Sequence, residues 1–163
     1  MHKVEFGNLG FEISRFGMGC MRLPMLDGDK PQVDDNEAIR MIRYAIDNGV
    51  NYIDTAYGYH EGRSEVIVGD ALRKGYRDKT KVATKLPVWH AKKYEDFERL
   101  LDEQLRRLKT DYVDFYLLHA LNETQWHRVK KLGVLDFLDD AIKKGKILYP
   151  GLSFHDELPV FKE

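Results

Sequence analysis

Apolar, strand-like segments alternate with amphipathic helical segments along most of this chain, with one strand about every 30 residues. This pattern is typical of consecutive right-handed βαβ units, because a parallel strand needs a crossover connection before the next strand. The strands are near-continuous apolar runs, as expected when helices cover a parallel sheet. Two architectures fit, an open doubly wound sheet and part of a (β/α)₈ barrel, and periodicity alone does not choose between them.

Five strands of this sheet are predicted, and the last begins after Pro150 because proline cannot donate to a ladder. They are Phe16–Gly19, Val50–Asp54, Lys81–Leu86, Tyr112–His119 and Gly151–Phe154. The predicted helices are one from Asp34 or Asp35 to Gly49, then Ser64–Arg73, Tyr94–Leu108 and Val134–Lys144. Asp34 with Glu37 has the spacing of a capping box, and the segment from Pro24 to Asp34 reads as a polar loop. On the last helix, the predicted inward residues are Leu135, Leu138, Ala141 and Ile142.

The first residues predict a β-hairpin, with Val4–Phe6 and Phe11–Ile13 on either side of a Gly/Asn turn at residues 7–10. The N-terminus has no apolar core of a signal peptide, and no apolar run approaches the ~20 residues that span a bilayer. We therefore expect a cytoplasmic protein without membrane contact. The net charge of −1 shows no basic face, so nucleic-acid binding is not expected. A single cysteine, Cys20, excludes a disulfide framework and a cysteine-clustered metal site.

Polar residues stand near the C-terminal ends of four predicted strands. They are Asp54, Lys85, His119 and Ser153. The carboxyl edge of a parallel sheet is where barrels and open α/β sheets place their active sites. One charged residue at a strand end is usually a solvated end, whereas a series in successive strands indicates a catalytic site.

Tyr59 lies in the loop that follows Asp54 and has a specific use beside these residues. A free phenol has a pKa of about 10, too high for an efficient proton donor near neutrality. A nearby ammonium such as that of Lys85 would stabilise the phenolate, and the carboxylate of Asp54 would anchor the ammonium. A neutral His119 could then orient a carbonyl oxygen that Tyr59 protonates. The residues therefore predict proton donation to a developing alkoxide.

The sequence resembles the aldo-keto reductases in five stretches that follow the family order. They are FGMGCMRLP, NYIDTAYGYHEGRSEVIVGDAL, VATKLP, DYVDFYLLH and GLSFH. The resemblance implies that Asp54, Tyr59, Lys85 and His119 form the family's catalytic tetrad. It also implies an oxidoreductase that uses NADP(H) or NAD(H) and acts on a small carbonyl or alcohol substrate.

The same resemblance assigns cofactor contacts. Gly19, Cys20, Met21 and Asp54 would lie at the nicotinamide, and Ser153 would hydrogen-bond its carboxamide. Family members often place asparagine after this serine, where this chain has Phe154 and then His155. That difference resembles the subgroup with a C-terminal iron–sulfur extension, although no cysteine cluster is present here to hold one.

The resemblance implies a partial (β/α)₈ TIM barrel. Residues 1–163 are predicted to form a single incomplete barrel domain, with residues 1–15 as its N-terminal hairpin and residues 16–163 as its strands 1 to 5 with their helices. In the family, the later strands and loops hold the diphosphate of the cofactor. This sequence contains none of them, so we expect weak cofactor binding. Two strand edges would be left unsatisfied, which predicts a homo-oligomer or a complementing chain.

Two other functions are consistent with the sequence. The chain could be a catalytically silent fragment that acts at most as an interaction module. It could also be a metal-dependent barrel hydrolase that uses His60 and His155 at the strand ends. No metal is expected, because Lys85 would place a cation among the ligands.

Overall fold

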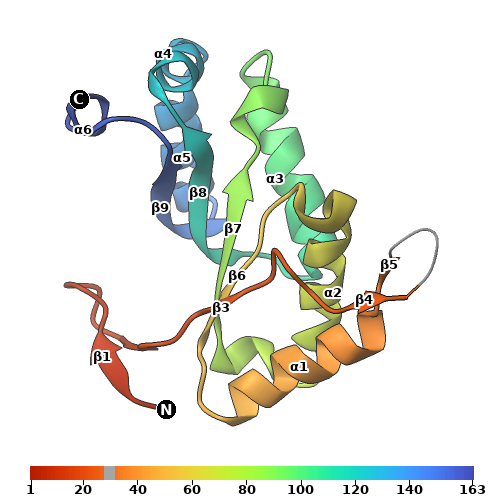
Figure 1. Ribbon diagram of the computed structural model, residues 1–163. Coiled ribbons are helices and arrows are strands. Elements are labelled where there is room, and N and C mark those ends of the chain that lie inside the picture. The colour runs from red at the N-terminus through yellow and green to blue at the C-terminus, as the bar shows by residue number, and fades with distance from the viewer. Residues whose placement is uncertain (28–31) are drawn as a thin grey trace. The chain divides into compact units, whose positions relative to one another are not determined.

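The computed structural model describes residues 1–27 and 32–163, in two compact units, Met1–Ala83 and Thr84–Glu163. A five-stranded sheet in the order β3-β6-β7-β8-β9 confirms the predicted α/β fold (Figure 1). Its strands are β3 (Met18–Gly19), β6 (Tyr52–Asp54), β7 (Lys81–Leu86), β8 (Val113–Leu121) and β9 (Ile147–Phe154). β3 with β6, β6 with β7, and β8 with β9 all pair in parallel, as expected for strands joined by helices.

The first unit begins with the predicted hairpin. β1 (Lys3–Glu5) pairs antiparallel with β2 (Glu12–Ser14), and Val4 lies opposite Ile13. Both strands are shifted by about one residue from the predicted bounds, within the usual uncertainty of element ends.

The segment that we predicted as a loop from Pro24 to Asp34 contains a second small hairpin. β4 (Met25–Leu26) pairs antiparallel with β5 (Gln32–Val33), and the prediction was wrong for these residues. The two-residue strands carry no alternation of buried and exposed side chains that a sequence pattern could report. The Asp34 amide donates to the Pro24 carbonyl at 2.8 Å and closes the pair. The rest of the predicted loop, residues 28–31, lies outside the described residues.

The first long helix, α1 (Asp35–Asp47), begins as its sequence predicts. The Asp34 carboxylate accepts from the Glu37 amide at 3.0 Å and so satisfies one of the unpaired N–H groups at the helix start. The helix ends before Gly49, whose φ of +92° few other residues tolerate. Its buried residues, at helical spacing, are Ala38, Ile42 and Ile46.

The next helix, α2 (Arg63–Ala71), packs against α1. Arg43 of α1 donates from its guanidinium to the carbonyls of Asp70 at 3.0 Å and Ala71 at 2.9 Å. The last carbonyls of a helix have no partner within the helix, so this arginine caps α2 while it ties the two helices together. A short 3₁₀ turn, η2 (Arg77–Lys79), then leads into β7.

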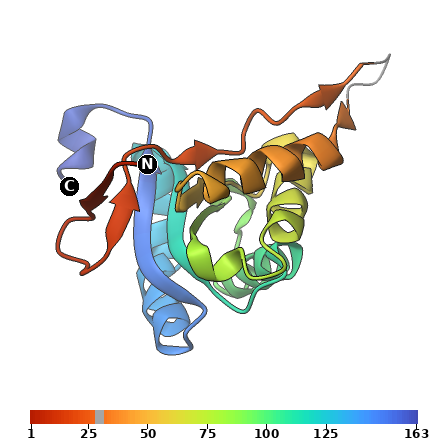
Figure 2. The same cartoon turned by 90° about the horizontal axis from the view of Figure 1, so that it is seen from below.

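In the second unit, α3 (Glu95–Leu108) and α5 (Val134–Lys143) pack against each other, with the rings of Phe97 and Phe137 5.4 Å apart. β8 and β9 run side by side (Figure 2). The unit also contains the 3₁₀ turn η3 (Val88–His90), α4 (Glu123–Lys131) and α6 (Leu158–Phe161). α4, whose bounds were not predicted, begins at an Asn122 cap that accepts from the Gln125 amide at 2.9 Å.

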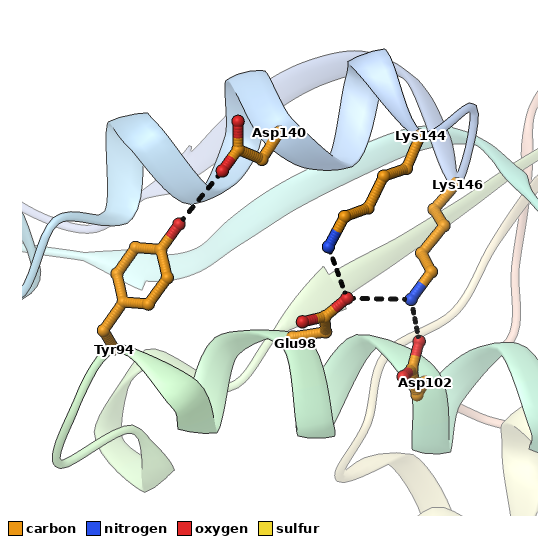
Figure 3. A network of polar contacts seen from close by, with 6 residues as sticks. All are labelled: Tyr94, Glu98, Asp102, Asp140, Lys144 and Lys146. Carbon is orange, nitrogen blue, oxygen red and sulfur yellow. Dashed lines mark hydrogen bonds and ion pairs between the residues drawn. The ribbon is translucent and has the colours of Figure 1, made fainter.

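Polar contacts between α3 and the end of α5 reinforce this packing (Figure 3). One oxygen of Glu98 accepts from Lys144 at 2.7 Å and from Lys146 at 3.2 Å, and Lys146 also reaches Asp102 at 2.6 Å. These charged hydrogen bonds lower the pKa of Glu98. Because the side chains are partly exposed, the network contributes modestly to stability beside the apolar contact of the helices.

The predictions for β9 and for the inward face of α5 were wrong. β9 begins at Ile147 and runs through Pro150, which lies opposite Tyr116. As the last strand in the sheet order, β9 can accommodate a residue without an N–H. On α5, Leu135 is 49% exposed and Ile142 38% exposed, because the helix turns Phe137 inward instead. Within the described ranges, no helix is long and apolar enough to cross a membrane.

Candidate active site

In the first unit, three of the predicted cofactor-contacting residues, Gly19, Cys20 and Asp54, lie at the end of β6. Asp54 lies opposite Gly19 of β3 on one side and Ala83 of β7 on the other. The Cys20 amide donates to the Asp54 carbonyl at 2.8 Å, which extends the β3–β6 ladder by one bond. The C-terminal ends of these strands therefore bring Gly19, Cys20 and Asp54 to one edge of the sheet.

These residues differ in what they offer to a ligand. Gly19 is exposed, and a Cβ atom added there would meet no atom within 4 Å. Met21 is 50% exposed, whereas the Cys20 side chain is fully buried. The open space beside Gly19 would let a planar group approach the backbone closely.

Tyr59 opens the 3₁₀ turn η1 (Tyr59–Gly62), which has an unusual backbone. The next three residues all have positive φ, 49° at His60, 55° at Glu61 and 88° at Gly62. Left-handed conformations cost non-glycine residues roughly 1–2 kcal/mol each. Such strain persists where the surroundings hold the chain in place, and it concentrates at functional sites.

Side chains of the first unit hold this strained turn. The Leu23 amide donates to Nε2 of His60 at 3.0 Å. Ser64, at the start of α2, donates to the Cys20 carbonyl at 2.9 Å and shares a hydrogen bond of 2.8 Å with Thr55. The hydroxyls of Thr55 and Ser64 are buried, so these bonds join the Tyr59 turn firmly to the end of the sheet.

Tyr52 of β6 lies near Asp54. Burial raises the pKa of Tyr52 to about 12, and the Asp54 carboxylate adds to the shift. A phenol with so high a pKa stays protonated and is a poor acid near neutrality. Tyr52 is therefore unsuited to the role of proton donor, which the sequence analysis assigned to Tyr59.

In the second unit, Lys85 of β7 and His119 of β8 form the other part of the predicted tetrad. Lys85 is only 6% exposed. The pKa of His119 is lowered to about 4, first by burial and then by the positive charges of Lys85 and His155. His119 is therefore neutral at pH 7. The ring of Trp89 lies 5.2 Å from that of His119, so this loop tryptophan packs beside the predicted site.

His119 does not close its strand as we predicted, because β8 continues to Leu121. The β8–β9 register breaks between Leu118 and Leu121, and Ala120 adopts a φ of 52°. Such an irregularity redirects a side chain at the edge of a sheet. The Ala120 amide donates to the Ser153 hydroxyl at 2.7 Å, so Ser153 of β9 secures the backbone directly after His119.

Replacing Ser153 with alanine should lower the free energy of unfolding by about 1 kcal/mol, because the half-buried Ala120 amide loses its acceptor. Urea denaturation monitored by circular dichroism measures this loss. Ser153→Thr keeps the hydroxyl and serves as the matched control. Equal stability of the alanine variant and the wild type would show that the bond contributes nothing to holding the irregularity.

Sequence reasoning missed two side chains that support these positions. Arg128 of α4 donates to the Ala91 carbonyl at 2.5 Å and to the Val88 carbonyl, and so holds the turn that carries Trp89. Gln104 of α3 is fully buried and reaches both β7 and β8. An amide among the leucines of an apolar helix face is a signal that could have revealed Gln104, whereas Arg128 had no such signal.

The predicted site residues thus fall in both units. Gly19, Cys20, Met21, Asp54 and Tyr59 belong to the first, and Lys85, His119 and Ser153 to the second. No group of three or more metal-ligating side chains occurs in the described part of the chain.

Comparison with known proteins now gives the family. The aldo/keto reductase family model matches residues 15–160, so the chain belongs to that family. It is 34% identical over 158 residues to a probable aldo-keto reductase 1 of Glycine max, covering 92% of this chain and 44% of that protein.

Solved structures agree. The thermostable aldo-keto reductase Tm1743, in complex with the inhibitor epalrestat, superposes with a TM-score of 0.79 at 28% identity, over 99% of this chain and 57% of that one. An aldo/keto reductase from Klebsiella pneumoniae, solved with NADP and acetate, gives a TM-score of 0.73 at 29% identity, over 93% and 49%. The chain therefore spans about half the length of the proteins it matches.

Proposed function

We propose that this chain carries the catalytic residues of an NAD(P)H-dependent oxidoreductase that reduces a carbonyl, with Tyr59 as proton donor. The observation that carries the proposal is the state of His119. Burial and the charge of Lys85 lower its pKa to about 4, so it is a neutral hydrogen-bond donor at pH 7. Orienting a carbonyl oxygen requires that form, because a neutral imidazole donates a hydrogen bond without competing with Tyr59 as the acid.

Each residue of the tetrad then has one task. His119 donates a hydrogen bond to the substrate oxygen and fixes its orientation. Tyr59 gives its phenolic proton to that oxygen as negative charge develops on it. Lys85 stabilises the phenolate that remains, and Asp54 balances the charge of the lysine. The pairing of Asp54 with Ala83, two residues before Lys85 on β7, supports this arrangement.

The residues present fit a nicotinamide cofactor. The Ser153 hydroxyl accepts from Ala120 and keeps its own hydrogen for a carboxamide oxygen. The open space beside Gly19 suits a planar ring. Met21 and Asp54 are the other proposed contacts, with Cys20 through its backbone. When bound, the cofactor supplies the hydride that the carbonyl carbon receives.

The proposal is tested by adding NADPH, and separately NADH, to the purified chain while its fluorescence is followed. A saturable change with a dissociation constant in the high micromolar to millimolar range is expected, together with oxidation of the cofactor when a small aldehyde is added. A monomer that shows no change at millimolar cofactor would exclude an active enzyme for this chain alone.

An alternative is a silent fragment that acts as an interaction module. β9 is the last strand in the sheet order, and Leu148 and Leu152 on it are 41% and 47% exposed. An end strand with apolar side chains favours pairing with a second copy or with a complementing chain. Sedimentation analysis separates the alternatives: self-association without cofactor binding would favour the module.

Two finer proposals follow from the sequence. The two units would act together as a single incomplete barrel domain. Phe154 and His155 after Ser153 place the chain near the subgroup with an iron–sulfur extension. Phe154→Asn restores the asparagine that family members often place directly after this serine, so it should strengthen cofactor binding through a second carboxamide contact.

A further inference from the structure

A buried carboxamide on α3 is bonded to the backbone of the proposed catalytic lysine. Gln104 is fully buried. Its Nε2 donates to the Lys85 carbonyl at 3.0 Å and to Oγ1 of Thr84 at 3.0 Å. Its Oε1 accepts from the Tyr116 hydroxyl at 2.8 Å. One side chain therefore links α3 to two strands. It reaches β7 at Thr84 and Lys85, and β8 at Tyr116.

Helix packing alone does not require this residue. The buried positions around Gln104 on α3 are apolar, namely Phe97, Leu100, Leu101, Leu105 and Leu108. Leucine or methionine would fill the same space, whereas a buried amide is costly unless it is fully hydrogen-bonded. The lysine carbonyl and the Thr84 hydroxyl use both hydrogens of the amide nitrogen, which fixes its orientation.

We propose that Gln104 is a positioning residue that fixes Lys85 at the end of β7, by holding the lysine's own carbonyl and the adjacent threonine. A flexible lysine side chain depends on its backbone for the placement of its charge, and small errors in placement are costly in catalysis. Thr84 and Tyr116, both fully buried, complete the support. The role of Gln104 in catalysis rests on the proposed function, whereas its effect on the position of the Lys85 charge beside His119 does not.

His119 reports the position of the Lys85 charge, because that charge is one cause of the low pKa of His119. If Gln104→Met lets the Lys85 ammonium move away from His119, its positive charge repels the protonated imidazole less strongly. The pKa of His119 should therefore rise by half a unit or more. Lys85→Met gives the upper limit of the shift. Titration of the full chain by ¹H–¹³C NMR of the imidazoles measures it, with His119→Gln to assign the signal.

Leu105→Met is the matched control, because it changes a buried α3 side chain of similar size without removing a hydrogen bond to β7. Its His119 pKa should equal that of the wild type. The proposal is overturned if Gln104→Met leaves the pKa unchanged, or if Leu105→Met shifts it as much. Should Gln104→Met not fold, the near-isosteric Thr84→Val removes one of the three bonds and should give a smaller rise, and no rise would equally overturn the proposal.

This titration uses neither cofactor nor substrate, so its outcome is independent of whether the chain reduces carbonyls. In an assembly with reductase activity, Gln104→Met should lower kcat several-fold with little change in KM for the carbonyl, because Lys85 acts in the proton-transfer step. If instead kcat/KM fell by the same factor through a rise in KM, Gln104 would contribute to the general packing of the site and not to the proton-transfer step.

Discussion

Tyr59→Phe is expected to reduce carbonyl reduction by roughly 10²–10⁴-fold, the usual contribution of a positioned general acid. The substitution removes the phenolic hydroxyl and keeps the ring. Cofactor binding should therefore stay close to that of the wild type. Steady-state assays of cofactor oxidation with a small aldehyde, run beside a fluorescence titration with NADPH, measure both quantities on the same protein.

The matched control is Tyr52→Phe. Tyr52 lies near Asp54, but burial and that carboxylate raise its pKa to about 12, so it is a poor acid near neutrality. Its loss should leave kcat nearly unchanged. If Tyr59→Phe kept a wild-type kcat, or if Tyr52→Phe lost as much activity, the role assigned to Tyr59 would be wrong.

Much of the fold could be predicted because local signals agreed with the tertiary structure. The cap of α1 at Asp34, the N-terminal hairpin and the bounds of β7 all follow from residue chemistry and short-range patterns. The pairing of β4 with β5 could not be predicted, because such short strands carry no pattern. The start of β9 was missed because Pro150 suits a strand at the end of the sheet order.

The candidate site could be proposed from the sequence where polar residues interrupt apolar strands, as at Asp54 and Lys85. What the sequence could not provide is the support around them. The left-handed backbone of Ala120 depends on a hydroxyl from another strand, Ser153, and the turn after Tyr59 depends on Leu23 and His60. These contacts join residues far apart in the chain, and periodicity does not report long-range hydrogen bonds.

Replacing Lys85 with methionine should affect both catalysis and the response of stability to pH. In the proposed reaction it removes the charge that stabilises the Tyr59 phenolate, so kcat should fall by at least about 10²-fold. It also removes one cause of the low pKa of His119. That pKa should rise from about 4 towards the ordinary value of 6.5, but it should stay below 6.5 because burial, the larger cause, remains.

The sign of the stability effect follows from proton uptake. Between pH 6.5 and about 4, His119 binds a proton in the unfolded chain but not in the folded one, so acidification through this window destabilises the wild type. In Lys85→Met the pKa of His119 in the folded protein is higher. The pH range in which only the unfolded chain binds this proton therefore becomes narrower, because its lower limit rises. The loss of unfolding free energy between pH 7 and pH 4.5 should therefore be smaller in the variant. Urea denaturation at both pH values measures it, with the exposed Lys143→Met as control. A larger acid loss in Lys85→Met than in the control would contradict the coupling of Lys85 to His119.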